Sequence, residues 1–351
     1  MPKGAAGKLS IPLGAFDLES VVGQGGMAKV WRGRHRTTGR VVAVKVLSER
    51  YAHDAKHRAA LRREIEVVSR LHHPRIVHLF DHGEVPPETA RESEGRIVTG
   101  SPYIVMAFVG GGTLQRVIET PLPWLPLRTF LLELLGALAH AHARGIIHRD
   151  LKPVNILLCG RDLSEGWKLT DFGLAHATEH DERLDQGITT EYAAGTPYYM
   201  APEQWEGQVR DYGPWTDLYA IGCIAYELIC GHPPFLGGMR QVMRSHLSRI
   251  PLPPPPRTPL PASLQKWVMR LLAKAPGHRF PWAADAAWAL AQIPVTPAGG
   301  GGEPIAGGDP EGAGKMAETL VVGGTLTTTL PPHASLPDFP EAALLPLSTP
   351  P

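Results

Sequence analysis

The fold is decided by the stretch His148-Arg149-Asp150-Leu151-Lys152-Pro153-Val154-Asn155, which is followed sixteen residues after Asn155 by Asp171-Phe172-Gly173. Asp150, Lys152, Asn155 and Asp171 supply two carboxylates, one ammonium and one amide oxygen within a short loop and the end of a following strand. Hard oxygen ligands of this kind suit Mg²⁺, which binds through one or two carboxylates together with substrate phosphates. The stretch therefore predicts a site that holds a magnesium-bound phosphate compound.

A glycine-rich segment near the start of the chain offers a second phosphate contact. It reads Val22-Gly23-Gln24-Gly25-Gly26-Met27-Ala28-Lys29-Val30. Glycines let the backbone approach phosphate oxygens and present N–H groups to them. Taken alone, the segment is equally compatible with an ordinary glycine-rich hairpin.

Lys45 strengthens the phosphate interpretation. It lies twenty residues beyond Gly25, in a stretch where Val42, Val44 and Val46 alternate with Ala43, Lys45 and Leu47. Alternation with a period of two predicts a strand. That strand can carry an ammonium group beneath the glycine segment.

Glu64 is the expected partner of Lys45. Residues 55–71 have apolar side chains at helical spacing, and Glu64 lies between Leu61 and Val68 on the face that should be buried. A buried, unpaired carboxylate costs several kcal/mol, so Glu64 should find a cation. The alternative is a glutamate at the edge of the apolar stripe that reaches solvent.

Composition excludes several classes of protein. The 351 residues contain 35 Lys plus Arg and 34 Asp plus Glu, so the chain lacks the positive excess of a dedicated duplex-binding protein. No apolar run is long enough to cross a membrane, and the first twenty residues lack a signal-peptide core. We therefore expect a soluble, cytoplasmic protein with no nucleic-acid partner. Cys159, Cys223 and Cys230 are expected to be small core residues.

The chain divides into regions of different composition. The first 95 or so residues are rich in strand patterns, and the part up to Pro294 is mostly helical. Segment 251–261 contains seven prolines and is expected to be a rigid loop, with recruitment of a partner module as the alternative. Residues 294–351 include 11 Pro and 10 Gly, which predicts a disordered tail. A docking or phosphoacceptor role for that tail is the alternative.

From about Phe16 to Pro294 the chain resembles a eukaryotic-type (Hanks-type) serine/threonine protein kinase of the bacterial branch. The matching motifs occur in the order of that family: the glycine segment, Val42-Ala43-Val44-Lys45, Glu64 with His73-Pro74, His148-Arg149-Asp150, Asp171-Phe172-Gly173, the segment from Gly195 to Glu203, Asp217 and Arg279.

The resemblance implies an α+β, two-lobed protein kinase fold. A small antiparallel β-rich N-lobe with one helix is expected at about 16–108, and a larger, mainly α-helical C-lobe at about 109–293. Together they form the expected kinase domain, 16–293. Residues 1–15 are expected to be a flexible N-terminus, and 294–351 a Pro/Gly-rich disordered tail.

The resemblance also implies an ATP-dependent, magnesium-dependent transfer to Ser or Thr hydroxyls of protein substrates. Asp150 would orient the acceptor hydroxyl, Lys152 would stabilise the transferring phosphoryl group, and Lys45, held by Glu64, would contact the α- and β-phosphates. Asn155 and Asp171 would hold Mg²⁺. The nucleotide would be bordered by a larger set: Val22, Gly23, Gln24, Gly25, Gly26, Met27, Ala28, Val30, Ala43, Lys45, Met106, Phe108, Asn155, Leu157 and Asp171. His148, Asp217 and the Glu203–Arg279 pair are expected to be scaffold.

Regulation by autophosphorylation is a further implication. A phosphate between Asp171 and Glu203 could pair with Arg149 and order that segment. The position relative to Gly195-Thr196 selects Thr190 as the acceptor, with Thr189 second. A transient homodimer would allow one copy to phosphorylate another. The alternative is a polar loop that has no switch.

Two rival functions share the fold. A pseudokinase scaffold that binds ATP would be expected to lack Lys45, Asp150, Asn155 or Asp171, and all four are present. A small-molecule phosphotransferase would keep the aspartates but lack the segment from Gly195 to Glu203, on which a protein substrate docks. Both observations favour a protein kinase.

Overall fold

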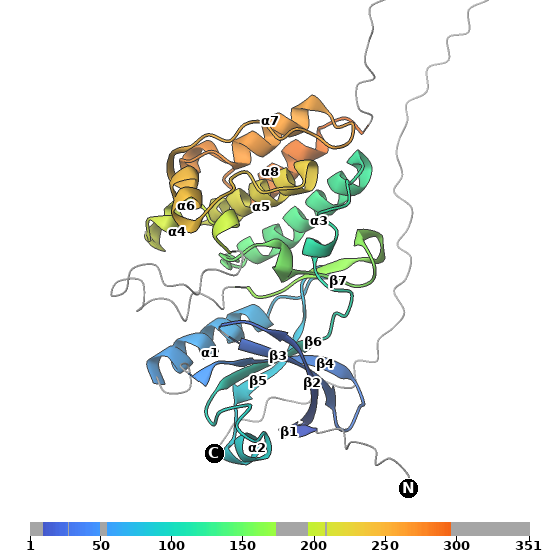
Figure 1. The fold of residues 1–351 in the computed structure, drawn as a ribbon, viewed down its shortest axis with the longest axis vertical. Coiled ribbons are helices and arrows are strands. Elements are labelled where there is room, and N and C mark those ends of the chain that lie inside the picture. Colours follow the sequence, from blue (N-terminus) through green and yellow to red (C-terminus); the bar gives the residue numbers. More distant parts are fainter. Residues whose placement is uncertain (1–9, 27, 50–54, 173–195, 208, 296–351) are drawn as a thin grey trace, which may run out of the picture. The chain divides into compact units, whose positions relative to one another are not determined.

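The computed structural model describes residues 10–26, 28–49, 55–172, 196–207 and 209–295 (Figure 1). Met27, Gly173, Thr189, Thr190 and Gly195, which carry some of the sequence predictions, lie outside these ranges, as does 296–351.

The N-lobe is a six-stranded antiparallel sheet in the order β1-β2-β3-β4-β6-β5 (Figure 1). Two helices accompany it. The elements are β1 (Ile11–Leu13), β2 (Phe16–Gln24), β3 (Ala28–His35), β4 (Val41–Leu47), α1 (Ala55–Ser69), β5 (Leu79–Glu84), α2 (Pro87–Glu92) and β6 (Pro102–Ala107).

Two details of this lobe differ from the sequence prediction. The segment expected to be a flexible N-terminus contains β1, because Ile11 and Leu13 bury their side chains in the apolar cluster of the sheet. The lobe also has α2 in addition to the single helix expected. This short helix has Pro87 in its first turn, where a missing N–H costs nothing, and the Thr89 hydroxyl donates to the Pro12 carbonyl of β1 at 2.6 Å.

Strand β4 is buried on both faces, which positions Lys45. Val42, Val44 and Val46 pack into the main cluster of the N-lobe, whereas Ala43 and Leu47 belong to clusters on the other face. In the antiparallel register Gly23 of β2 lies opposite Val30 of β3, and Val30 lies opposite Lys45. The predicted placement of an ammonium group beside the glycine segment is thus present in the sheet.

The C-lobe is mainly helical, with a two-stranded antiparallel sheet beside it. Its helices and strands are α3 (Trp124–His142), β7 (Ile156–Leu158), β8 (Trp167–Leu169), α4 (Pro202–Trp205), α5 (Pro214–Cys230), α6 (Met239–Ser248), α7 (Ala262–Leu271) and α8 (Ala283–Ala291). Short 3₁₀ turns occur at Leu114–Arg116, Pro153–Asn155, Leu163–Glu165, Thr196–Tyr199, Val209–Asp211 and Pro276–His278.

Helix α5 forms the centre of the C-lobe core. It is buried nearly all round, as its continuous apolar sequence predicts, and packs in one cluster with α3, α7 and α8. The helix is terminated after Cys230 by Gly231, whose φ is 91°. Glycine adopts this left-handed conformation readily, whereas other residues are strained in it. The proline-rich segment 251–261 connects α6 to α7, and Arg257 within it donates to the Ile118 carbonyl at 2.7 Å.

The three cysteines do not share one environment. Cys223 is buried in α5, and burial raises the pKa of its thiol. Cys230 is half-buried, and Cys159 is exposed. The prediction that all three are core residues is therefore wrong for Cys159, which lies in the turn between β7 and β8. Within the described part of the chain, no helix is long and apolar enough to span a bilayer.

Acid should destabilise the C-lobe through His246. This side chain of α6 is fully buried against Phe235, its Nδ1 lies 2.8 Å from the Tyr219 hydroxyl, and Lys274 is the cation that acts on it. Burial, assisted by Lys274, lowers the pKa of His246 to about 3. The unfolded chain binds this proton below pH ~6.5 and the folded chain does not, so stability is lost as pH falls from ~6.5 towards 3.

We expect this group to remove about 2 kcal/mol of the free energy of unfolding between pH 7 and pH 5. Urea unfolding of the wild type and of His246→Gln at both pH values measures it. The pH-dependent difference should shrink by about that amount in the variant, whatever its absolute stability. Equal differences in the two proteins would show that His246 is not the titrating group.

Candidate active site

Asp217 of α5 binds the backbone of the loop that follows α3. The Asp217 carboxylate accepts hydrogen bonds from the backbone N–H groups of His148 and Arg149, both at 2.8 Å, and lies 2.9 Å from His142 Nε2. Burial alone would raise the pKa of Asp217, but hydrogen bonds and charge from His142 and His148 outweigh it and keep that pKa below its ordinary value. The carboxylate therefore fixes the backbone on which Asp150 stands.

Two further contacts tie this loop to its surroundings. His148 Nε2 lies 2.9 Å from the Thr170 carbonyl, and its ring packs on Phe172 at 4.6 Å between centroids. The Gln204 amide of α4 donates to the Arg149 carbonyl at 2.7 Å. Sequence reasoning did not identify His142 or Gln204, because neither forms part of a local motif.

Asp150, Lys152 and Asn155 form one hydrogen-bonded group. Lys152 Nζ lies 2.9 Å from Asp150 Oδ2. Asn155 Nδ2 donates to the Asp150 carbonyl at 2.7 Å and to Asp150 Oδ2 at 3.2 Å. The Thr170 N–H donates to the Asn155 carbonyl at 2.9 Å, which joins this loop to the end of β8 immediately before Asp171.

Lys45 of the N-lobe forms an ion pair with Asp171. Its Nζ lies 2.8 Å from Asp171 Oδ1, and the two side chains are 15% and 26% exposed. Burial would raise the pKa of Asp171, but Lys45, His148 and Lys152 together hold it below its ordinary range. The carboxylate is therefore ionised at neutral pH. The backbone bond from Thr170 to Asn155 brings the Lys45–Asp171 pair close to the group formed by Asp150, Lys152 and Asn155.

The expected pair between Lys45 and Glu64 is not the one that forms. Glu64 of α1 faces Arg149, with Oε1 at 3.7 Å from Nη1, whereas Lys45 pairs with Asp171. The sequence indicated that Glu64 needs a cation, and in the structure Glu64 does pair with a cation, Arg149. The choice of Lys45 as that cation was wrong, since which cation Glu64 meets depends on where α1 sits.

Two residues of the site have left-handed backbone conformations without being glycine. Arg149 has φ 66° and Asp171 has φ 63°. Such conformations cost of order 1–3 kcal/mol and persist where the surroundings fix them. At Arg149 that fixing comes from Asp217 and Gln204, which bond to its N–H and its carbonyl.

An apolar cluster lies beside the polar network. Its buried members are Ala43, Val77 and Met106, and Val30, Phe108 and Leu157 pack against it. Five residues predicted to border the nucleotide are thus gathered into one cluster from four strands and the segment after β6. They are Val30, Ala43, Met106, Phe108 and Leu157.

The glycine segment is mostly exposed at its glycines and buried at Ala28. Gly25 donates its N–H to the Ala28 carbonyl at 2.9 Å, and a Cβ added at Gly25 would meet nothing within 4 Å. Val22 and Gln24 are exposed, as are Gly25 and Gly26, and Gly23 is half-buried. Ala28 is buried in a cluster with Leu61 and Ile65 of α1, so its methyl group faces α1.

The segment after β6 contains a feature that the prediction missed. Gly111 N–H donates to the Leu158 carbonyl at 2.9 Å, and Leu158 N–H donates to the Gly112 carbonyl at 2.9 Å. A Cβ at Gly111 would lie 2.3 Å from two carbonyl oxygens, so only glycine fits. The run of three glycines at 110–112 was the available signal. This close contact holds β7, which carries Leu157, against the segment that follows β6.

The residues present fit a magnesium ion bound jointly with phosphates. Asn155 donates hydrogen bonds from Nδ2 to Asp150, which leaves its amide oxygen available as a metal ligand, and Asp171 supplies an ionised carboxylate. Among the described residues no group of three or more His, Cys, Asp or Glu side chains could hold a metal ion alone. A hard cation here would need oxygens from a substrate, as Mg²⁺ commonly does.

An antiparallel N-lobe, a helical C-lobe and a polar network joining the two define the two-lobed protein kinase fold. Comparison with known proteins agrees. The model of the protein kinase domain family matches residues 16–287.

Curated relatives include the serine/threonine-protein kinases PknB of Mycobacterium tuberculosis, 37% identical over 277 residues, and of Mycobacterium leprae, 35% identical over 274 residues. Each alignment covers 77% of this chain and 41% of the relative. The crystal structure of the Mycobacterium tuberculosis PknI kinase domain aligns with a TM-score of 0.58 at 28% identity, covering 82% of this chain and 99% of that one.

The chain therefore belongs to the protein kinase domain family and groups with bacterial serine/threonine kinases of the Hanks type. It spans about two fifths of the length of the curated relatives it matches.

Proposed function

We propose that this domain transfers the γ-phosphoryl group of ATP to Ser or Thr hydroxyls of protein substrates. The observation that carries the proposal is the pairing of Lys45 of the N-lobe with Asp171, which directly follows Thr170, a residue hydrogen-bonded to Asn155 of the loop that also bears Asp150. Catalysis of this kind is mostly positioning and electrostatic stabilisation, because negative charge is spread over the transferring group.

Each residue then has a defined task. Asp150, whose Oδ2 is held by Lys152 and Asn155, orients the acceptor hydroxyl and accepts its proton. Lys45 contacts the α- and β-phosphates, and Lys152 stabilises the transferring group. Asn155 and Asp171 would hold Mg²⁺, which when bound neutralises charge on the phosphates. The apolar cluster around Ala43 and Met106 borders the adenine, and the glycine segment covers the phosphates.

Label transfer from ATP tests the proposal directly. The chain is incubated with magnesium, labelled ATP and a threonine-containing protein, and phosphorylated residues are mapped by mass spectrometry. Label should appear with the wild type and fall by about 10²- to 10⁴-fold with Asp150→Asn. Asp285→Asn, an exposed change in the first turn of α8, is the matched control and should leave transfer unchanged. Equal labelling by Asp150→Asn and the wild type would remove Asp150 from the mechanism. Absence of transfer in every sample would favour the ATP-binding scaffold.

Thr190, and next Thr189, are proposed as sites of autophosphorylation. Arg149 lies 3.7 Å from Glu64, so its guanidinium is already placed to receive an anion from outside the loop. A phosphate carries nearly two charges and makes stronger, bidentate bonds to arginine than a single distant carboxylate oxygen. The same mass spectra should map phosphate to these threonines. If one copy modifies another in a transient homodimer, the initial rate should rise with the square of the concentration of the chain.

A further inference from the structure

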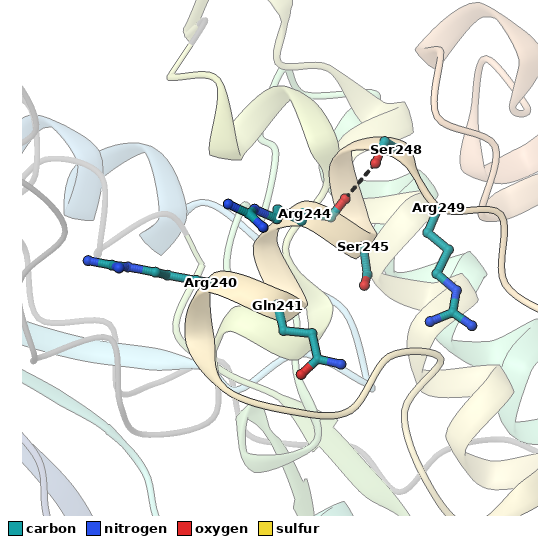
Figure 2. A pocket seen from close by; sticks show the side chains of 6 residues that line it. All are labelled: Arg240, Gln241, Arg244, Ser245, Ser248 and Arg249. Carbon is teal, nitrogen blue, oxygen red and sulfur yellow. Dashed lines mark hydrogen bonds between the residues drawn. The ribbon is translucent and has the colours of Figure 1, made fainter.

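Helix α6 presents a strongly basic face that the proposed mechanism does not use. Arg240, Arg244 and the following Arg249 are all exposed. They line a hollow of about 560 Å³ together with Gln241, Ser245 and Ser248. Figure 2 shows the three arginines extending from this one helix and its end, with the Ser248 hydroxyl bonded back to the Arg244 carbonyl. The opposite side of α6 is anchored by Val242 and His246, so the basic face is held in place.

These arginines lack the partners that other arginines of the domain have. Within the described ranges, no acidic side chain pairs with Arg240, Arg244 or Arg249, whereas Arg75, Arg36 and Arg279 each pair with a carboxylate. The surrounding sequence explains this difference. Residues 228–284 contain eight Lys or Arg and no Asp or Glu. The eight are Arg240, Arg244, Arg249, Arg257, Lys266, Arg270, Lys274 and Arg279.

The basic face is unfavourable for the helix that carries it. Arg240 and Arg244 are four residues apart, and like charges at that spacing destabilise a helix. Arg240 also lies in the first turn, where the helix dipole disfavours a cation. Both costs would be offset by an anion bound over this face, since carboxylates accept bidentate bonds from arginine.

The neighbouring residues indicate which anion fits. Leu236 precedes α6 and is 57% exposed, while Ile250 and Leu252 follow it and are each 76% exposed. Apolar side chains at both ends of a basic helix match a peptide that combines acidic and apolar residues. Three arginines, two on α6 and one just after it, are few for a nucleic acid, whose binding rests on many phosphates.

The position of α6 connects this surface to substrate binding. The helix packs against the segment Thr196–Tyr199, and the Tyr198 hydroxyl donates to the Gly237 carbonyl just before α6 at 3.4 Å. We propose that the α6 basic face, defined by Arg240, Arg244 and Arg249, docks an acidic, apolar-containing segment of the protein substrate while its Ser or Thr reaches Asp150. The role in substrate choice rests on the proposed kinase function; the binding itself does not.

Binding of a defined probe tests the docking without ATP. The probe is a fluorescein-labelled twelve-residue peptide of alternating Glu and Leu, titrated with the whole chain at 0.1 M salt and followed by anisotropy. The variant Arg240→Gln/Arg244→Gln/Arg249→Gln should bind at least tenfold more weakly than the wild type. The matched control Arg70→Gln/Arg91→Gln/Arg161→Gln loses the same charge from exposed positions and should stay within twofold. The wild type should prefer this probe over its Gln-Leu counterpart.

Kinetics separate docking from catalysis. A threonine peptide with the Glu-Leu extension should show at least a tenfold higher KM with the α6 variant and an unchanged kcat, because docking contributes equally to ground and transition states. The same peptide without the extension should be phosphorylated equally by both. Equal affinity of the α6 variant and the wild type for the probe overturns the proposal. So does tighter, α6-dependent binding of a single-stranded DNA or of anionic vesicles than of the peptide. If the wild type binds the probe but transfers no phosphate to any peptide, the kinase function fails and the docking surface stands.

Discussion

Replacing Lys45 by methionine is expected to lower kcat/KM for phosphoryl transfer by about 10²- to 10³-fold, the scale on which one preorganised charge acts at a reacting group. The ammonium lies 2.8 Å from Asp171, and Lys45 is opposite Val30 of the glycine-segment hairpin, so in the proposed mechanism it is placed to contact phosphates bound beside both. Methionine keeps most of the length of the side chain and removes the ammonium, with its charge and its N–H donors.

The domain should remain folded after this change, because the Asp171 side chain is 26% exposed and water can solvate its carboxylate once the ammonium is gone. Steady-state kinetics and urea unfolding of the same preparation separate the two effects. Lys266→Met, which removes an exposed ammonium on α7, is the matched control and should retain full activity. Since Lys45 and Asp171 are in contact, Lys45→Met/Asp171→Asn should lose much less than the product of the single losses. A Lys45→Met chain with wild-type kcat/KM would contradict the proposed role.

Replacing Glu203 by alanine should have the largest effect on stability, about 3–5 kcal/mol of the free energy of unfolding. Glu203 of α4 accepts two bonds from the Arg279 guanidinium, at 2.8 and 2.9 Å, and a third from the Thr216 hydroxyl of α5 at 2.9 Å. The Arg279 side chain is fully buried. Removing the carboxylate leaves a positive charge with no counter-ion in the core of the C-lobe.

Urea unfolding measures this loss, and an exposed pair provides the control. Asp17 and Arg36 lie 2.9 Å apart with side chains 39% and 44% exposed, so Asp17→Ala should cost less than about 1 kcal/mol. Glu203→Leu/Arg279→Met should regain much of the stability, because it removes both buried charges. A Glu203→Ala loss no larger than that of Asp17→Ala would show that solvent reaches Arg279.

Much of the candidate site could be predicted because its residues are close together in the sequence. Asp150, Lys152 and Asn155 lie on one loop, and a loop this short brings its own polar groups together. The alternation around Val44 predicted β4, and the spacing of Leu61, Ile65 and Val68 predicted α1. These patterns depend on local geometry, with periods of two and 3.6 residues, which any folded context must respect.

Partners that come from different elements were predicted less well. Glu64 pairs with Arg149 instead of Lys45, Asp217 supports the loop through backbone N–H groups, and Gly111 lies against the Leu158 carbonyl. The short helix α2, strand β1 and the exposure of Cys159 also depend on neighbours distant in the chain.

The chemical groups that this protein carries, and the elements on which they lie, follow from the sequence, because side-chain type and local periodicity are properties of short segments. Which cation each carboxylate meets, and which face of α6 stays open to solvent, became known from the three-dimensional arrangement. Those outcomes depend on how helices and strands pack, and packing sums many weak contacts between residues far apart along the chain.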